Sequence, residues 1–236
     1  MWLDGREQKK NKNYQGSALY LAEGKLTSSS DKAIDFSNKK LADGTCVCCR
    51  VAMRHTADDQ VAAMWRHIYD DNIRDHAILT FNGQSELQQP IRASFDEWQL
   101  DGCPHQGPGL SINAQNRYHM VWFNNGSKGK GLFYAHSDDN GKNQSKPLSI
   151  GDVNGQASYA NVISHGDTVD LVWVQFNGQH YQLYHQRSKD NGQTFADANV
   201  ISQSSSDTDR PFLIERAGQH FVSWQRPSVG HQVIAL

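Results

Sequence analysis

The stretch Asp170-Leu-Val-Trp173 is a short apolar segment that ends in tryptophan, and variants of it recur along the chain. Similar segments end at Trp2, Trp65, Trp122 and Trp224. The spacing between these tryptophans is roughly 50 to 60 residues, which is typical of proteins built from repeated sheet units. The position of any other residue within its unit can therefore be predicted from its distance to the nearest tryptophan.

Each repeat contains four short strand-like segments, here A to D, with the tryptophan on B. In one repeat, strand A is Gly109-Leu-Ser-Ile112, C is Gly131-Leu-Phe-Tyr-Ala-His136 and D is Pro147-Leu-Ser-Ile150. Four-stranded antiparallel units at this spacing predict an all-β propeller, six-bladed when complete. A two-sheet sandwich would explain the strands but not their regular recurrence. No segment keeps a helical period for three turns, so we expect no helix.

The 236 residues are expected to form a single domain (1–236) of three full and two partial blades. The chain opens at the end of a B strand and closes on 232–236, which has the pattern of a C strand. Proteins avoid exposed sheet edges. We therefore expect that N-terminal blade material is lacking from this sequence, or that self-association, a partner chain or swapped strands close the ring.

The composition argues against several classes of partner. The formal charge of −2 and the pI near 6.6 do not favour nucleic acid or an anionic membrane surface. No apolar run approaches the length of a membrane span. The polar segment Met1–Lys10 has no signal-peptide core.

The segment Ser188-Lys-Asp-Asn-Gly-Gln-Thr-Phe195 resembles the Asp box, S-x-D-x-G-x-T-F/W, of sialidase-type propellers, and Ser137-Asp-Asp-Asn-Gly141 keeps its first half. Both fall between strands C and D. We expect Asp190 to accept backbone N–H bonds that hold the turn, which is a structural role.

Two further motifs extend the resemblance to bacterial sialidase-like BNR-repeat proteins. They are Asp43-Gly-Thr-Cys-Val-Cys-Cys-Arg50 and Asp101-Gly-Cys-Pro-His-Gln-Gly-Pro108. The resemblance implies a glycan or other anionic ligand, a glycosidase activity of the exo-sialidase kind, and a periplasmic or secreted location. Sialidases also carry an F/Y-R-I-P motif for their first substrate-binding arginine, and that motif is absent from this sequence.

In a propeller, the D–A and B–C connections lie on one face around the central channel, and the C–D turns lie on the other. Charged residues of this chain concentrate in the D–A and B–C connections. We expect an anionic ligand to be held there by Arg50, Arg66 and Arg210, together with His67 and Tyr159, and we expect Asp75 or Asp209 to act as acid/base. The alternative for the arginines is salt bridging between blades.

The four cysteines also fall in D–A connections. On an extended strand, Cys46 and Cys48 would share a face and Cys49 would point the other way. Cys103 occupies the equivalent place in the next blade, and His105 follows it. This set suits Zn²⁺ or Cu⁺ and would make the protein a metal-binding propeller. The alternatives are a disulfide of Cys46 or Cys48 with Cys103 in a non-catalytic binding module, or buried free thiols.

Overall fold

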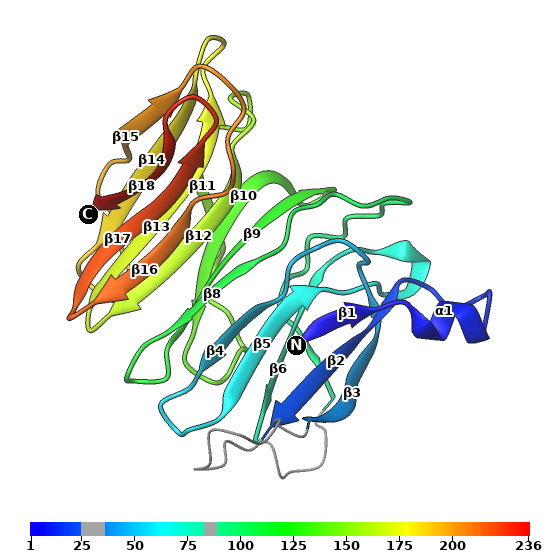
Figure 1. The fold of residues 1–236 in the computed structure, drawn as a ribbon. Coiled ribbons are helices and arrows are strands. Elements are labelled where there is room, and N and C mark those ends of the chain that lie inside the picture. Colours follow the sequence, from blue (N-terminus) through cyan, green and yellow to red (C-terminus); the bar gives the residue numbers. More distant parts are fainter. Residues whose placement is uncertain (25–35, 83–88) are drawn as a thin grey trace, which may run out of the picture.

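The computed structural model describes residues 1–24, 36–82 and 89–236, which form five antiparallel sheets (Figure 1). The first sheet contains β1 (Trp2–Asp4), β2 (Ser17–Gly24) and β3 (Phe36–Thr45). The second contains β4 (Ala52–His55), β5 (Val61–Arg66), β6 (His76–Phe81) and β7 (Ile91–Arg92). In each sheet, strands that are consecutive in the chain pair with one another.

The remaining three sheets repeat this topology. The third contains β8 (Gly109–Ile112), β9 (Tyr118–Gly126), β10 (Gly129–Ser137) and β11 (Leu148–Ile150). The fourth contains β12 (Ser158–His165), β13 (Thr168–Phe176), β14 (Tyr181–Ser188) and β15 (Asn199–Ser204). The fifth contains β16 (Phe212–Arg216), β17 (Gln219–Arg226) and β18 (Gly230–Ala235).

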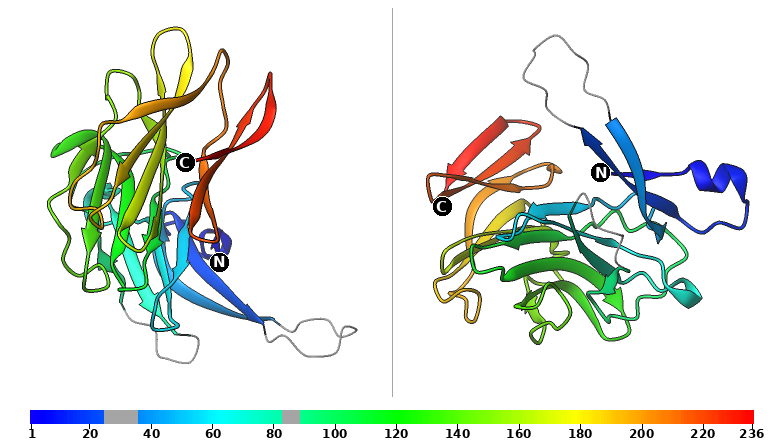
Figure 2. Two further views of the ribbon diagram at one scale, coloured as in Figure 1. Left: turned by 90° about the vertical axis from the view of Figure 1, so that its left-hand side faces the viewer. Right: turned by 90° about the horizontal axis from the view of Figure 1, so that it is seen from below.

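The sheets follow one another in chain order around a common axis, as Figure 2 shows. The prediction of an all-β propeller with three four-stranded and two partial blades is therefore confirmed. The tryptophans of β5, β9, β13 and β17 are at most 2% exposed, because each packs into the core between neighbouring sheets. Six blades and closure by another chain remain predictions.

Helical structure is limited to two short connections, and the prediction of no helix is wrong there. Helix α1 (Arg6–Lys10) lies between β1 and β2, and a 3₁₀ turn, η1 (Asp70–Asn72), lies between β5 and β6. In α1, Glu7 lies in the first turn and Lys10 in the last, which complements the helix dipole. Both are far shorter than three turns, so they leave no periodic signal. In the part of the chain that the structure describes, no helix is long and apolar enough to cross a membrane.

The turn between β14 and β15 has the role predicted for it. The Asp190 carboxylate accepts backbone N–H bonds from Gln193 (3.1 Å) and Thr194 (2.9 Å), and Ser188 Oγ accepts the Gly192 N–H (2.9 Å). Gly192 has a φ of +79°, and a Cβ there would lie 1.9 Å from the Tyr134 hydroxyl oxygen of the preceding sheet. The turn therefore packs directly on the neighbouring blade.

A buried carboxylate joins the fourth and fifth sheets. Asp170 on β13 is 0% exposed and lies 2.6 Å from His185 Nε2 and 2.5 Å from His220 Nδ1. Arg187 donates two hydrogen bonds to the same carboxylate, at 2.7 and 2.8 Å. Burial opposes ionisation, but these hydrogen bonds outweigh it and hold the pKa of Asp170 well below its usual range. The network is a structural link between blades.

Candidate functional site

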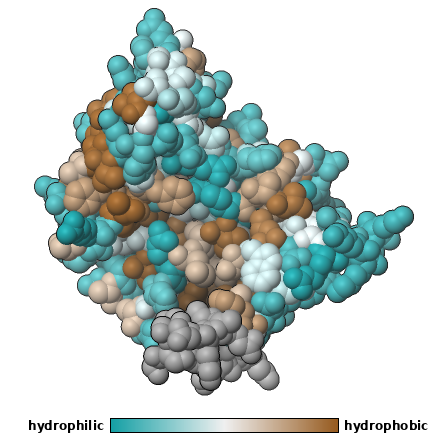
Figure 3. All heavy atoms as spheres, in the orientation of Figure 1, coloured by the Kyte–Doolittle hydropathy of each residue, from teal (hydrophilic) through white to brown (hydrophobic). Residues whose placement is uncertain are grey.

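The innermost strands surround a central cavity of about 510 Å³. Its wall combines β1, the residues leading into β4 and β8, and single residues of β12 and β16. The lining side chains include Arg50, Met53, Arg54, Asn161 and Phe212. Figure 3 shows apolar side chains gathered over β16 to β18 and over the strands around β4 and β8. The exposed apolar residues on these inner strands include Met53, Phe212 and Ile214.

Arg50 is one of two arginines among the described residues that line this cavity; the other is Arg54. Arg50 belongs to the connection between β3 and β4, and its guanidinium carbon lies 4.9 Å from the centroid of the Phe212 ring. Among the residues that the structure describes, it has no hydrogen-bond or ion-pair partner, and its Nε is buried. Burial, together with the nearby Arg210 charge, lowers the pKa of Arg50 to about 10. A guanidinium in this state favours an anion that supplies the missing partner.

Arg210 and Tyr159 lie next to each other, and Arg210 is close enough to Arg50 to affect its pKa, although neither lines the cavity. The Arg210 guanidinium carbon is 4.9 Å from the Tyr159 ring centroid, and its Nη2 donates to the His105 carbonyl (2.6 Å). Tyr159 has a φ of +58° at an irregularity of β12, where its N–H donates to Gln106 Oε1 (3.3 Å). Positive φ is costly for an aromatic residue, so the surrounding contacts must fix this position.

Asp209 precedes Arg210 and is exposed. Its charge stabilises the protonated form of Arg50, which indicates that the two groups are close. The structure therefore brings together four of the predicted site residues around Arg50, namely Arg50, Tyr159, Asp209 and Arg210, of which only Arg50 lines the cavity. The other three predicted residues lie elsewhere.

Arg66 is a structural residue in this fold. It is 1% exposed, and it donates to the backbone carbonyls of Arg74 (2.6 Å), Phe123 (2.6 Å) and Gln106 (3.1 Å). Its guanidinium carbon also lies 4.9 Å from the Trp98 ring centroid. Three backbone carbonyls, one of them on β9, occupy its donors, so the described residues show no salt bridge of Arg66 and its side chain faces away from solvent.

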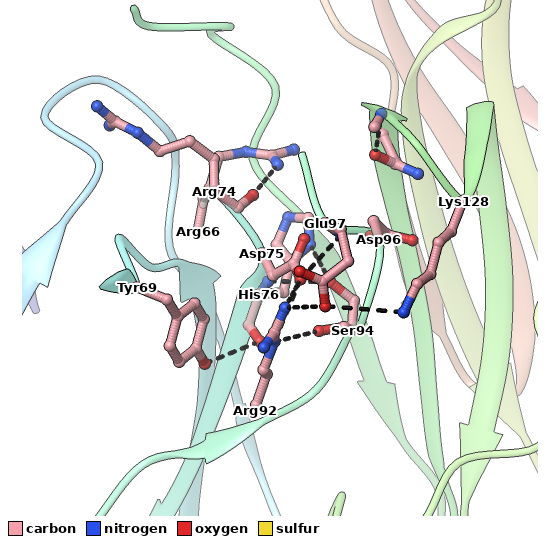
Figure 4. Close-up of polar contacts among 12 residues, drawn as sticks. Arg66, Tyr69, Arg74, Asp75, His76, Arg92, Ser94, Asp96, Glu97 and Lys128 are labelled. Carbon is pink, nitrogen blue, oxygen red and sulfur yellow. Dashed lines mark hydrogen bonds and ion pairs between the residues drawn. The ribbon is translucent and has the colours of Figure 1, made fainter. Parts of the chain in front are cut away.

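Asp75 is also removed from the cavity. Its side chain is 0% exposed and ion-paired with Arg92, which in turn contacts Glu97 Oε1 at 2.9 Å (Figure 4). Lys128 extends the network, at 3.8 Å from Glu97. A carboxylate buried in this way cannot reach a ligand in the central cavity, so the predicted acid/base role of Asp75 is wrong for that site.

His67 lines a different hollow, of about 570 Å³, between the first and second sheets. Its ring contacts Trp65 Nε1 at 3.4 Å and Tyr69 at a centroid distance of 4.6 Å. Burial lowers the pKa of His67 to about 4, so its ring is neutral at physiological pH. His67 therefore carries no positive charge for an anionic ligand.

The cysteines form a turn rather than an extended strand. Cys48 and Cys103 form a disulfide, with Cα atoms 6.4 Å apart, and Cys46 Sγ lies 3.2 Å from Cys49 Sγ. The prediction that Cys49 points away from Cys46 is wrong, because a turn brings residues three apart together. The Cys49 thiol hydrogen bond lowers the pKa of Cys46, and the same contact raises that of Cys49. His105 is exposed and lies outside this cluster, with Nδ1 2.9 Å from the Cys103 carbonyl oxygen.

Asp96 is a candidate that sequence reasoning missed. It lines a hollow of about 450 Å³ that also contains Trp122, Lys128 and Lys146, and its Oδ2 accepts the Trp122 Nε1–H (2.9 Å). Burial raises the pKa of Asp96 to about 6, so this carboxyl can give up a proton near neutral pH. Its signal in the sequence is the acidic pair Asp96-Glu97, directly after a D strand.

The fold is similar to two solved glycosidase structures. One is the Hadza microbial sialidase Hz136, with 15% identity, a TM-score of 0.52 and coverage of 80% of this chain and 44% of that chain. The other is a mutant of the α-L-arabinofuranosidase arb93a from Fusarium graminearum in complex with an iminosugar inhibitor, with 10% identity, a TM-score of 0.54, and coverage of 79% and 60%.

This chain therefore spans about half the length of those two proteins. At such low identity the likeness establishes the fold: the chain is a β-propeller of the kind found among glycoside hydrolases. No protein-family model and no curated protein sequence matches the chain.

Proposed function

We propose that this protein is a glycan-directed, sialidase-like propeller that binds an acidic sugar at the mouth of its central cavity. The observation that carries the proposal is the Arg50 guanidinium, which lines the cavity and has no carboxylate partner in the described part of the chain. In this proposal Arg50 and Arg210 hold the anionic group, and Tyr159 provides an aromatic surface.

The composition of the cavity also supports a sugar ligand. Apolar side chains such as Met53 and Phe212 lie beside Arg54 and Asn161, and such mixed surfaces suit sugars, which have both C–H faces and hydroxyl groups. We further propose a periplasmic or secreted location, because a disulfide such as Cys48–Cys103 persists in oxidising compartments.

The direct test is titration calorimetry with acidic sugars, namely a sialic acid and a hexuronic acid, against neutral hexose and pentose controls at low and high salt. We expect the acidic sugars to bind at least about tenfold more tightly than the neutral sugars, and we expect added salt to weaken their binding. Equal affinity for neutral and acidic sugars, or no binding of either, would contradict the proposal.

Hydrolysis is a second candidate, favoured by one observation: Asp209 is an exposed carboxylate beside Arg210 and close to Arg50. Against it, the described residues that line the cavity include no carboxylate. Turnover of a fluorogenic sialoside by the wild type but not by Asp209→Asn, with sugar affinity retained in the variant, would establish hydrolysis. Sugar binding without turnover would leave the protein as a binding module.

A further inference from the structure

The four cysteines of the chain gather in one region, although they come from two different connections. Cys46, Cys48 and Cys49 belong to the turn after β3, and Cys103 belongs to the connection between β7 and β8. The sulfur atoms of Cys46, Cys48 and Cys103 all lie within 4.8 Å of one another. Cys49 adds a fourth sulfur, 3.2 Å from that of Cys46, although it lies beyond 4.8 Å from at least one of the other two sulfurs.

One of these separations already matches the geometry of a tetrahedral metal site, and opening the disulfide would let the other sulfurs adjust to it. Zinc–sulfur bonds are about 2.3 Å long, which places the sulfurs of a tetrahedral site about 3.8 Å apart. The Cys46 and Cys103 sulfurs are 3.7 Å apart. Opening the Cys48–Cys103 disulfide would make two further sulfur ligands available at the same place.

We propose that the four thiolates of the reduced protein bind one soft metal ion, Zn²⁺ or Cu⁺, and that the Cys48–Cys103 disulfide is the oxidised, metal-free state of the same site. A dithiol reductant supplies two electrons and two protons to the disulfide and is itself oxidised to a disulfide. The four resulting thiols lose their protons as the metal binds. The site is chemically distinct from the anion site proposed above.

The surroundings provide access and charge compensation. Cys48 and Cys49 line the central cavity, which gives an ion a path to the sulfurs. The Cys46 N–H donates to the Arg66 carbonyl (3.0 Å), and the Arg66 guanidinium is buried without a carboxylate partner in the described residues. Its positive charge would offset part of the negative charge of a tetrathiolate centre.

The structure excludes His105 from the ligand set, although its spacing in the sequence suggests a C-x-H pair. Its side chain is exposed and its Nδ1 lies 2.9 Å from the Cys103 carbonyl oxygen, whereas the Cys49 sulfur is buried and contacts that of Cys46. The proposal is therefore a four-sulfur site, and His105→Ala is a matched control for Cys46→Ser.

The test compares the oxidised and the reduced wild-type protein and so requires no variant to fold. After anaerobic removal of the dithiol, we expect reduced protein to bind one equivalent of Zn²⁺, and to give a thiolate-to-cobalt charge-transfer band with Co²⁺. Oxidised protein should do neither. Failure of the reduced wild type to bind stoichiometric Zn²⁺ or Cu⁺ would overturn the proposal.

The two variants then identify the ligands. Cys46→Ser should weaken Zn²⁺ binding by about a hundredfold, since one of four strong ligands is lost. His105→Ala should leave the affinity and the cobalt spectrum unchanged. If His105→Ala lost metal to the same extent as Cys46→Ser, or if Cys46→Ser bound Zn²⁺ as tightly as the wild type, the four-sulfur site would be wrong.

Discussion

The guanidinium of Arg50 stacks on the ring of Phe212, 4.9 Å from its centroid, so that the connection before β4 meets strand β16 across the central cavity. An arginine positioned by an aromatic ring keeps its N–H donors available, whereas one positioned by a carboxylate does not. This contact distinguishes Arg50 from Arg66, whose donors are already occupied by three backbone carbonyls.

We expect Arg50→Gln to weaken binding of an acidic sugar by about 10- to 100-fold, because a charge-assisted hydrogen bond contributes about 1.5–3 kcal/mol. Calorimetry at low salt measures the change. The matched control is Arg216→Gln, an exposed arginine on the strand that carries Phe212 and outside the cavity lining. If both variants lost affinity equally, general electrostatic attraction rather than a site at Arg50 would explain the binding.

Arg66→Met should lower the free energy of unfolding by about 3 kcal/mol, because it leaves three buried carbonyls without donors. Urea unfolding followed by tryptophan fluorescence measures this. Under native conditions the affinity for acidic sugars should change less than about twofold. A variant of wild-type stability with lost sugar affinity would instead show that Arg66 contacts the ligand.

Asp170→Asn should destabilise the protein by about 3–5 kcal/mol at neutral pH, because it removes the charge that the surrounding side chains bind. The folded state lowers the pKa of Asp170, so the wild type gains this stability above the unfolded pKa of about 4 and loses it as the pH falls further. The difference between the two proteins should therefore shrink in acid. Asp167→Asn, in an exposed turn nearby, should have little effect at any pH.

The repeat architecture was predictable because it depends on local patterns that recur. The four most deeply buried tryptophans, at most 2% exposed, each lie on a B strand, and the turn at Asp190 depends on bonds within a few residues. The position of Arg50 on the cavity wall was also predictable, since it lies just before an A strand of the repeat, while its role in binding stays a prediction. The local periodicity of the sequence is enough to predict the strands of each blade and the side on which a residue lies.

The errors concern residues whose role depends on contacts between distant segments. Arg66 and Asp75 have positions in the repeat that predict the cavity side, but partners distant in the sequence bury them. The arginine is bound by the Phe123 and Gln106 carbonyls, and the aspartate is paired with Arg92. The cysteine turn was predicted as a strand because spacing alone cannot distinguish the two. Asp96 was missed because residues of the adjacent sheet bury it, and a local sequence pattern contains no information about that sheet.

Asp96→Asn should stabilise the protein at mildly alkaline pH. Burial raises the pKa of Asp96 from 3.8 to about 6, so the folded state resists losing this proton. The free energy of unfolding of the wild type therefore falls as the pH rises from about 4 through 6. The loss reaches up to about 3 kcal/mol at pH 8, before solvent screening reduces it. The amide oxygen of asparagine can still accept the Trp122 Nε1–H, so the fold is retained.

Thermal and urea unfolding of the wild type and Asp96→Asn across this pH range measure the effect. The two proteins should have equal stability below about pH 4, where Asp96 is protonated in both states, and should diverge as the pH rises. Glu97→Gln is the informative control, because Glu97 is ion-paired with Arg92 and its loss should not stabilise the protein. A stability difference for Asp96→Asn that is the same at all pH values would show that the carboxyl ionises normally, and that the hollow around it does not hold a proton near neutral pH.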